Sequence, residues 1–174
     1  MAEPRFILIA EEGERQLVER ALPGLDWPVV VTGVGGVNII RSLQQLPREA
    51  TIINIGYAGS SNFEIGSWVE VTESRVNHPN CTYPEPVLPL TPLSEVLAEI
   101  NYTDLLKDET MKTPIRAVDY TNSDFVLASD YRDCTFDMEL AFIMAFGFKR
   151  VCSIKYVSDN LSLHAYHEMT QGVN

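Results

Sequence analysis

The sequence has few basic residues. Its 174 residues include 13 lysines and arginines against 24 aspartates and glutamates, which gives a net charge of −11. A protein that binds duplex DNA neutralises backbone phosphates with lysine and arginine, and an anionic membrane surface attracts the same positive charge. We therefore expect neither a nucleic acid nor a membrane as a partner.

Cysteines and long apolar runs are also scarce. The three cysteines, Cys81, Cys134 and Cys152, are an odd number without paired short spacing, which favours a reducing compartment. The apolar run Phe6-Ile-Leu-Ile-Ala10 is followed by acidic residues and is too short for a signal peptide or a transmembrane helix. Together these features predict a cytoplasmic protein.

Several catalytic motifs are missing. No Gly-x-Ser-x-Gly elbow occurs, which argues against an α/β serine hydrolase. The turn Gly33-Val-Gly35-Gly36-Val37-Asn38 lacks the sixth glycine of a dinucleotide site, and the next strand ends in Asn54-Ile55-Gly56 without an acidic residue for a ribose. His164 and His167 lack a clear further metal ligand. We therefore expect no metal and no cofactor.

Short apolar runs alternate with helical spacing along the chain, which predicts one α/β domain over residues 1–174. Residues at about 76–121 are rich in proline and form an expected irregular excursion, with one short helix at 93–100. The expected strands are 6–10, 28–32, 51–55, 67–75, 124–128 and 151–157, and the other expected helices are 11–22, 37–46 and 137–146.

Carboxylates occur at two expected element boundaries, one strand end and one helix start. Asp159 comes directly after strand 151–157, so it lies at the carboxyl edge of the sheet, where open α/β folds bind ligands. Asp137 and Glu139 lie in the first turn of a helix, where the helix dipole favours negative charge. From these residues alone, Asp159 is equally a turn residue or a catalyst, and the other two carboxylates are explained by the helix.

Four segments, taken in order, resemble the purine nucleoside phosphorylase and nucleosidase family. Its methylthioadenosine/S-adenosylhomocysteine nucleosidase branch has turns like G-I-G-K-V-N and N-T-G-S-A-G, then V-E-M-E at a helix start and I-S-D at a strand end. The resemblance extends from Phe6 to Asn160. The matching segments are Val31-Thr-Gly-Val-Gly-Gly-Val-Asn38, Ile53-Asn-Ile-Gly-Tyr-Ala-Gly59, Phe136-Asp-Met-Glu139 and Tyr156-Val-Ser-Asp159.

This resemblance implies a three-layer αβα sandwich with a twisted, largely parallel central sheet, and a homodimer with active sites near the subunit contact. It implies hydrolysis of the N-glycosidic bond of a purine nucleoside. A phosphorylase would place an arginine shortly before the third turn to bind phosphate, but the segment is Ile52-Ile-Asn-Ile55. Water is therefore the expected nucleophile, although Arg41 or Arg75 could supply a positive charge.

Two alternatives stay open beside the nucleosidase and phosphorylase hypotheses. The chain could be a noncatalytic nucleoside-binding protein that keeps the fold. The shared segments could also reflect only the turns that many α/β proteins have in common, because a fold does not determine a function.

Carried over by position, the resemblance gives roles to two groups of residues. Asp159 would protonate the purine at N7, so that the base leaves more readily. Glu139 would accept hydrogen bonds from the ribose hydroxyls, and Met138 would pack against the sugar. The backbone near Phe125 and Val126 would hold the edge of the base.

The water-activating glutamate of this family follows the first strand. Glu14 fits that position best, and Glu12 is the second choice. Tyr57 stands where the family has a small residue, and its ring would stack on the base or fill the pocket. The expected substrate-binding set is completed by Ala58, Gly59 and Ser158.

Overall fold

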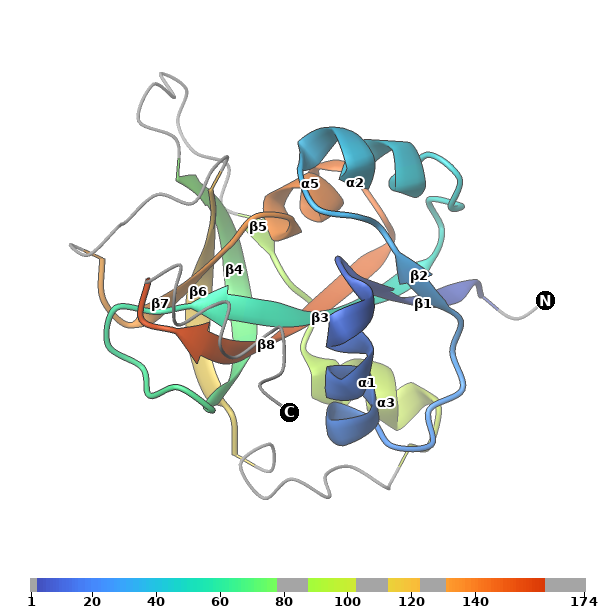
Figure 1. Cartoon of the computed structure of the whole chain (residues 1–174). Helices are drawn as coiled ribbons and strands as arrows, with labels where there is room; N and C mark the ends of the chain where they lie inside the picture. Colours follow the sequence, from blue (N-terminus) through green and yellow to red (C-terminus); the bar gives the residue numbers. More distant parts are fainter. Residues whose placement is uncertain (1–2, 78–87, 103–112, 123–130, 162–174) are drawn as a thin grey trace.

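The chain folds around one mixed β-sheet that helices cover on both sides (Figure 1). The computed structural model describes residues 3–77, 88–102, 113–122 and 131–161. The strands are β1 (Arg5–Ile9), β2 (Val29–Val31), β3 (Thr51–Gly59), β4 (Trp68–Asn77), β5 (Leu88–Pro89), β6 (Ile115–Asn122), β7 (Cys134–Asp137) and β8 (Arg150–Asp159). The helices are η1 (Glu12–Glu14, 3-10), α1 (Arg15–Ala21), α2 (Gly36–Leu43), α3 (Leu93–Glu99) and α5 (Leu140–Ala145).

The sheet combines parallel and antiparallel pairs. β1 lies parallel to β2 and β3, β3 parallel to β8, and β6 parallel to both β4 and β7. The pairs β3–β7, β4–β5 and β4–β8 are antiparallel. Following the pairs from β3 through β8, β4, β6 and β7 leads back to β3, so part of the sheet closes into a barrel.

The α/β class is therefore confirmed, but the expectation of a largely parallel sheet is wrong. The cause is the short connection at residues 60–67, which joins β3 to β4. A parallel crossover needs a dozen or more residues, so a link this short reverses the chain direction. As a result β4 runs against β8, the strand that lies parallel to β3.

Two apolar cores lie on opposite faces of the sheet. One packs α1 and α3 against side chains that alternate along β3, including Ile53, Ile55 and Tyr57. The other packs α2 and α5 against Leu8, Ile52 and Val151. Figure 1 shows these two helix pairs on the two sides of β1, β3 and β8. Residues one position apart on β3 therefore belong to different faces.

Most elements form where the sequence pattern places them, with two corrections. The irregular excursion expected at about 76–121 is wrong for its last part, because Ile115–Asn122 forms β6 inside the barrel. Its buried Asp119 and Thr121 hide the strand, since a polar buried face does not show the usual apolar alternation.

The helix expected at 137–146 begins later, at Leu140, because Cys134–Asp137 forms strand β7. The strand expected at 124–128 lies outside the described residues. No helix in the described parts of the chain is long and apolar enough to cross a membrane.

The α3 side of the sheet offers a test of this packing that is independent of any function. Leu97 is buried in the core beneath α3, whereas Ser94 on the same helix is exposed. We expect Leu97→Ala to lower the free energy of unfolding by about 2–5 kcal/mol, because it leaves a cavity. Ser94→Ala should change it by less than about 0.5 kcal/mol. Urea unfolding of both variants measures the difference, and equal effects would contradict the assigned faces.

Candidate functional site

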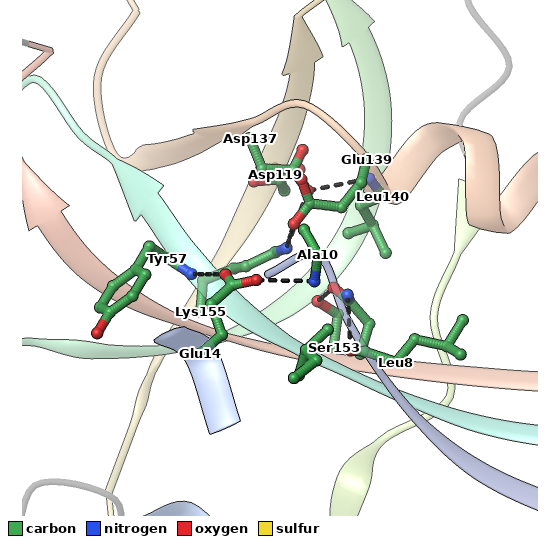
Figure 2. A network of polar contacts seen from close by, with 12 residues as sticks. Leu8, Ala10, Glu14, Tyr57, Asp119, Asp137, Glu139, Leu140, Ser153 and Lys155 are labelled. Atoms are coloured by element: carbon green, nitrogen blue, oxygen red, sulfur yellow. Dashed lines mark hydrogen bonds and ion pairs between the residues drawn. The ribbon is translucent and has the colours of Figure 1, made fainter. Parts of the chain in front are cut away.

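A buried lysine lies at the centre of the most polar region inside the sheet. Lys155 comes from β8 and its side chain is fully buried. Its Nζ donates to Asp137 Oδ2 at 2.9 Å and to Glu139 Oε1 at 3.1 Å (Figure 2). A buried ammonium is tolerated only when it is paired and hydrogen-bonded. The two carboxylates therefore explain how Lys155 can lie inside the protein.

Asp137 joins this lysine to the start of α5. Asp137 Oδ2 also accepts from the Leu140 backbone N–H at 2.9 Å, and its Oδ1 accepts from the Thr121 hydroxyl at 2.9 Å. The Thr121 hydroxyl in turn accepts from the Ala141 N–H at 2.8 Å. The first free N–H groups of α5 are satisfied by β6 and β7 side chains, which fixes the helix against the strands.

The Lys155–Asp137 pair is ionised. Burial raises the pKa of Asp137, but the charge of Lys155, the neighbouring Asp119 and the hydrogen bond from Thr121 outweigh burial and hold that pKa below its usual value. Burial lowers the pKa of Lys155, but Asp137, Glu139 and Asp119 together hold it above its usual value. An opposite charge at hydrogen-bond distance favours the charged form of each partner.

Glu14 reaches the same region from η1, and its carboxylate binds three backbone N–H groups. Oε1 accepts from Ala10 at 2.7 Å and from Glu11 at 3.1 Å, while Oε2 accepts from Tyr57 at 2.7 Å (Figure 2). The turn after β1 thus wraps around the Glu14 carboxylate and attaches it to β3. Glu14 is buried although it lies in a surface turn.

Gly56 leaves the space in which the two glutamates meet. A Cβ at this position would lie 2.5 Å from Glu14 Oε2 and 3.2 Å from Glu139 Oε1. Both carboxyl groups therefore lie over the same backbone position of β3. We call Glu14, Asp119, Asp137, Glu139 and Lys155 the carboxyl–lysine cluster.

The two glutamates of the cluster have raised pKa values. Burial raises the pKa of Glu139 to about 8; Lys155 opposes this shift, and the nearby Asp137 and Glu14 add to it. Burial also raises the pKa of Glu14, against the opposing effects of Lys155 and the three backbone N–H groups. Carboxyls with raised pKa values are suited to proton transfer near pH 7.

The second N-terminal candidate, Glu12, lies elsewhere. Its side chain is exposed and accepts from Arg15 at 2.9 Å on the surface. The two arginines considered as sources of positive charge are also outside the cluster, since Arg41 is exposed on α2 and Arg75 pairs with Glu73 at 3.1 Å. The cation of the cluster is Lys155, which the sequence analysis missed. Its signal was a single charge within the apolar strand 151–157.

Asp159 ends β8 and lies further along the same strands. It is 1% exposed; its Oδ2 accepts from the Ser158 hydroxyl and its Oδ1 from the Leu161 N–H, both at 2.8 Å. Burial raises the pKa of Asp159, and these two hydrogen bonds oppose the shift. This buried acid lies at the carboxyl edge of the sheet, the position expected from the sequence.

Gly59 marks how far Asp159 lies from the cluster. The β3–β8 register shifts between Ala58 and Gly59, which puts Gly59 opposite Asp159, and a Cβ on Gly59 would lie 2.8 Å from Asp159 Oδ1. Gly56 and Gly59 are three residues apart, or about 10 Å along an extended strand. The structure thus brings Glu14 and Glu139 together and places Asp159 beyond their hydrogen bonds.

The Tyr57 ring does not face the carboxyl–lysine cluster. It packs in the α1 core, where its hydroxyl accepts from Gln16 at 2.8 Å and its ring meets Tyr156 edge-on at 6.0 Å. Only the Tyr57 N–H reaches Glu14. Figure 2 shows the ring directed away from Lys155.

The other expected substrate-binding residues are placed as follows. Ala58 and Ser158 are buried neighbours, with the Ser158 hydroxyl 3.5 Å from the Ala58 carbonyl oxygen. Met138 is half-buried between Asp137 and Glu139. Phe125 and Val126 lie outside the described residues.

Comparison with known proteins identifies the fold. No family model and no curated protein sequence matches the chain. Among solved structures, it is similar to the 5′-methylthioadenosine/S-adenosylhomocysteine nucleosidase of S. pneumoniae with a transition-state inhibitor, at 17% identity and a TM-score of 0.70, covering 95% of this chain and 91% of that chain.

Two further structures of such nucleosidases (MTAN) agree. An Asp-to-Asn variant from Helicobacter pylori with 5′-methylthioadenosine in the active site matches at 16% identity and a TM-score of 0.66, covering 98% of this chain and 93% of that one. The Chlamydia trachomatis protein bound to adenine matches at 16% identity and a TM-score of 0.66, covering 96% and 87%. At these identities the similarity shows the fold. It confirms the α/β fold of such nucleosidases, with the mixed sheet described above in place of the largely parallel one expected.

Removing the buried charge tests how the cluster is held together. Lys155→Met keeps an unbranched side chain but leaves Asp137 and Glu139 without a cation. We expect it to lower the free energy of unfolding at pH 7 by about 3–5 kcal/mol. Their folded-state pKa values would then lie above the unfolded values, so the loss should shrink as the pH falls toward 4.

Lys149→Met is the matched control, because Lys149 is exposed and pairs with Glu3 at the surface. It should cost less than about 1 kcal/mol. Chemical unfolding at pH 7 and pH 4.5 measures both variants. A Lys155→Met effect as small as the control, or one that grows as the pH falls, would contradict the ion pairing described here.

Proposed function

We propose that this chain hydrolyses the N-glycosidic bond of a purine nucleoside and releases the free base. The observation that carries the proposal is that three buried carboxyls, from η1, the start of α5 and the end of β8, lie against glycines of β3. Glu14 and Glu139 meet over Gly56, and Asp159 lies over Gly59 toward the strand ends. The fold supports it, since its neighbours include nucleosidases described with 5′-methylthioadenosine and with adenine.

Asp159 is the proposed acid. A buried carboxyl with a raised pKa keeps a proton to donate, which is the state that departure of a base requires. In the proposed reaction Asp159 gives its proton to the purine, and the electrons of the N-glycosidic bond move to the base. The sugar thereby acquires oxocarbenium character.

Glu14 and Glu139 would act on the sugar and the water. Glu14 takes one proton from a water molecule, whose oxygen forms the new bond to the sugar carbon that the base leaves. Its three backbone N–H partners hold it in one position for this step. Glu139 lies on the same glycine and would bind the ribose hydroxyls, with Met138 beside it. Lys155 keeps the Glu139 side chain in place.

The charge of the cluster favours water over phosphate as the nucleophile. A phosphate site needs a positive charge that is free to bind the anion, and arginine supplies it best. Lys155 is already shared by Asp137 and Glu139. The carboxylates around it would repel phosphate.

The proposal predicts that Asp159→Asn abolishes base release. Purified protein should release adenine from methylthioadenosine without phosphate, and loss of the general acid should lower the rate by about 10²–10⁴-fold. Asp26→Asn, an exposed aspartate, is the control and should keep full activity. Release of adenine is measured by chromatography.

Other outcomes would separate the alternatives. Turnover that requires phosphate would make the protein a phosphorylase. Tight binding of purine nucleosides without base release would make it a noncatalytic binding protein. Full activity in Asp159→Asn would remove Asp159 from the catalytic role.

We also propose that the protein is a cytoplasmic homodimer that uses α2. Val34, in the turn before α2, and Val37 and Ile40 on α2 stand three residues apart and are all exposed, Val37 by 73%. An apolar row on a surface helix is typical of a contact with another protein. The resemblance to a homodimeric family makes a second copy the expected partner. Cys134 and Cys152 are free and buried, which suits a reducing compartment.

A charge on this row should break the dimer. Val37→Glu would bury a carboxylate in the contact, so we expect mainly monomer by sedimentation velocity at micromolar concentration, where the wild type sediments as a dimer. Ser94→Glu on α3, on the other side of the sheet, should not change the association state. Identical sedimentation of the wild type and Val37→Glu would contradict this interface.

A further inference from the structure

The carboxyl–lysine cluster contains a second buried aspartate, Asp119, which has no part in the proposed reaction steps. Asp119 lies on β6, fully buried, in a reciprocal arrangement with β7. The parallel register puts Asp119 opposite Thr135 and Thr121 opposite Asp137. The Thr135 hydroxyl donates to Asp119 Oδ1 at 2.6 Å, and the Thr121 hydroxyl donates to Asp137 Oδ1 at 2.9 Å. Two Asp–Thr pairs thus cross between the strands.

The other oxygen of Asp119 has an unusual environment. Asp119 Oδ2 is buried and accepts no hydrogen bond from the residues that the structure describes. The register places Asp119 diagonally opposite Asp137 on the neighbouring strand, and Figure 2 shows the two side chains next to each other. Two ionised carboxylates are both acceptors and repel each other, so they can make a hydrogen bond only if one of them holds a proton.

The surroundings decide which aspartate holds that proton. Asp137 accepts from Lys155, Leu140 and Thr121, all of which favour its ionised form. Asp119 accepts only from Thr135 among the described residues. The proton is therefore expected on Asp119, whose O–H donates a hydrogen bond to Asp137.

We propose that Asp119 is a positioning residue: it is protonated and donates a hydrogen bond to Asp137. The two aspartates then carry a single negative charge, and Lys155 is held between Asp137 and Glu139. This role rests on the proposed function where it concerns catalysis, because Glu139 is the proposed ribose ligand. With a second negative charge on β6, Lys155 would be drawn toward the aspartates and away from Glu139.

The ionisation of Asp119 agrees with this geometry. Burial raises its pKa well above the usual value, and the neighbouring Asp137 raises it further. The titratable groups around Asp119 are Asp137 and Cys134 on β7 and Lys155 on β8, with Glu139 and Glu14 on the far side of Lys155. Lys155 lowers the pKa of Asp119, but burial and Asp137 outweigh it.

Asparagine at position 119 imitates the protonated aspartate, because its amide can donate to Asp137 and its oxygen can accept from Thr135. The wild type must take up a proton at Asp119 on folding at any pH above the unfolded value of about 4. Its stability contribution is complete below that pH and is lost as the pH rises through the raised folded-state pKa. Asn has no such loss.

The first test is the unfolding midpoint of the wild type and Asp119→Asn between pH 4 and pH 8. We expect the unfolding midpoint of Asp119→Asn, relative to that of the wild type, to increase steadily as the pH rises from 4. A difference that stays constant with pH, or that falls, would overturn the protonated state of Asp119. Thr135→Val is the control. It removes the other hydrogen bond of Asp119 but leaves the titratable carboxyl at position 119 in place.

The second test reads the position of Lys155 directly. In protein labelled with 15N-lysine, the Nζ signal of Lys155, assigned with Lys155→Arg, should be kept in Asp119→Asn and shifted or broadened in Asp119→Leu, which has no donor for Asp137. Methylthioadenosine hydrolysis should fall by up to about 100-fold in Asp119→Leu, as misplaced groups cost, and be largely restored in Asp119→Asn.

An unmoved Lys155 signal in Asp119→Leu, or a signal equally displaced in Asp119→Asn, would overturn the positioning role. If the wild type releases no adenine, the proposed function is wrong, but the unfolding and 15N measurements still decide the role of Asp119. If Asp119→Leu does not fold, Asp119→Asn decides it, by the pH dependence of its midpoint and by its Lys155 signal.

Discussion

The structure depends on one buried positive charge, the ammonium of Lys155. It lies on β8, where β3 and β4 pair on either side, and it binds carboxylates from the end of β7 and the start of α5. The ring of strands closes through β3, β8, β4, β6 and β7, so this ion pair crosses the interior of the barrel. Burying the ammonium costs several kcal/mol, and only the close carboxylates offset that cost. Any rearrangement of β7 against β8 would leave a charge unpaired.

The same constraint bears on the proposed proton transfers. Four carboxyls share one lysine, so they cannot all be ionised in a buried space. The structure distributes the protons unequally: the lysine holds Asp137 in its ionised form, whereas the pKa of Glu139 rises to about 8 and that of Asp119 rises well above its usual value. Carboxyls with separated pKa values in one site are what acid and base roles require. The stability of the barrel and the reactivity proposed for the site therefore depend on the same buried charges.

The sequence predicted those parts of the molecule whose signal is local. Apolar runs located β1, β3 and β8, and the position of Asp159 at a strand end followed from the run before it. It did not predict β6 or the role of Lys155. Both are polar positions that face a buried interior, and a polar residue is recognisable as buried only when its partner, here more than ten residues away in the chain, is known. The mixed strand directions of the sheet could not be predicted for a similar reason, since they depend on which strands pair and not on residue type.

The β3 segment Gly56-Tyr57-Ala58-Gly59 shows how a bulky residue fits between the carboxyls of the proposed site. Glu14 and Glu139 press on Gly56, and Asp159 presses on Gly59, so a side chain at either position would collide with a carboxyl. Tyr57 lies between them, and strand alternation directs its side chain to the α1 core, where a large ring is an advantage. A bulky residue at position 57 is therefore compatible with the proposed site, because its ring lies on the α1 side of β3, away from the two glutamates over Gly56.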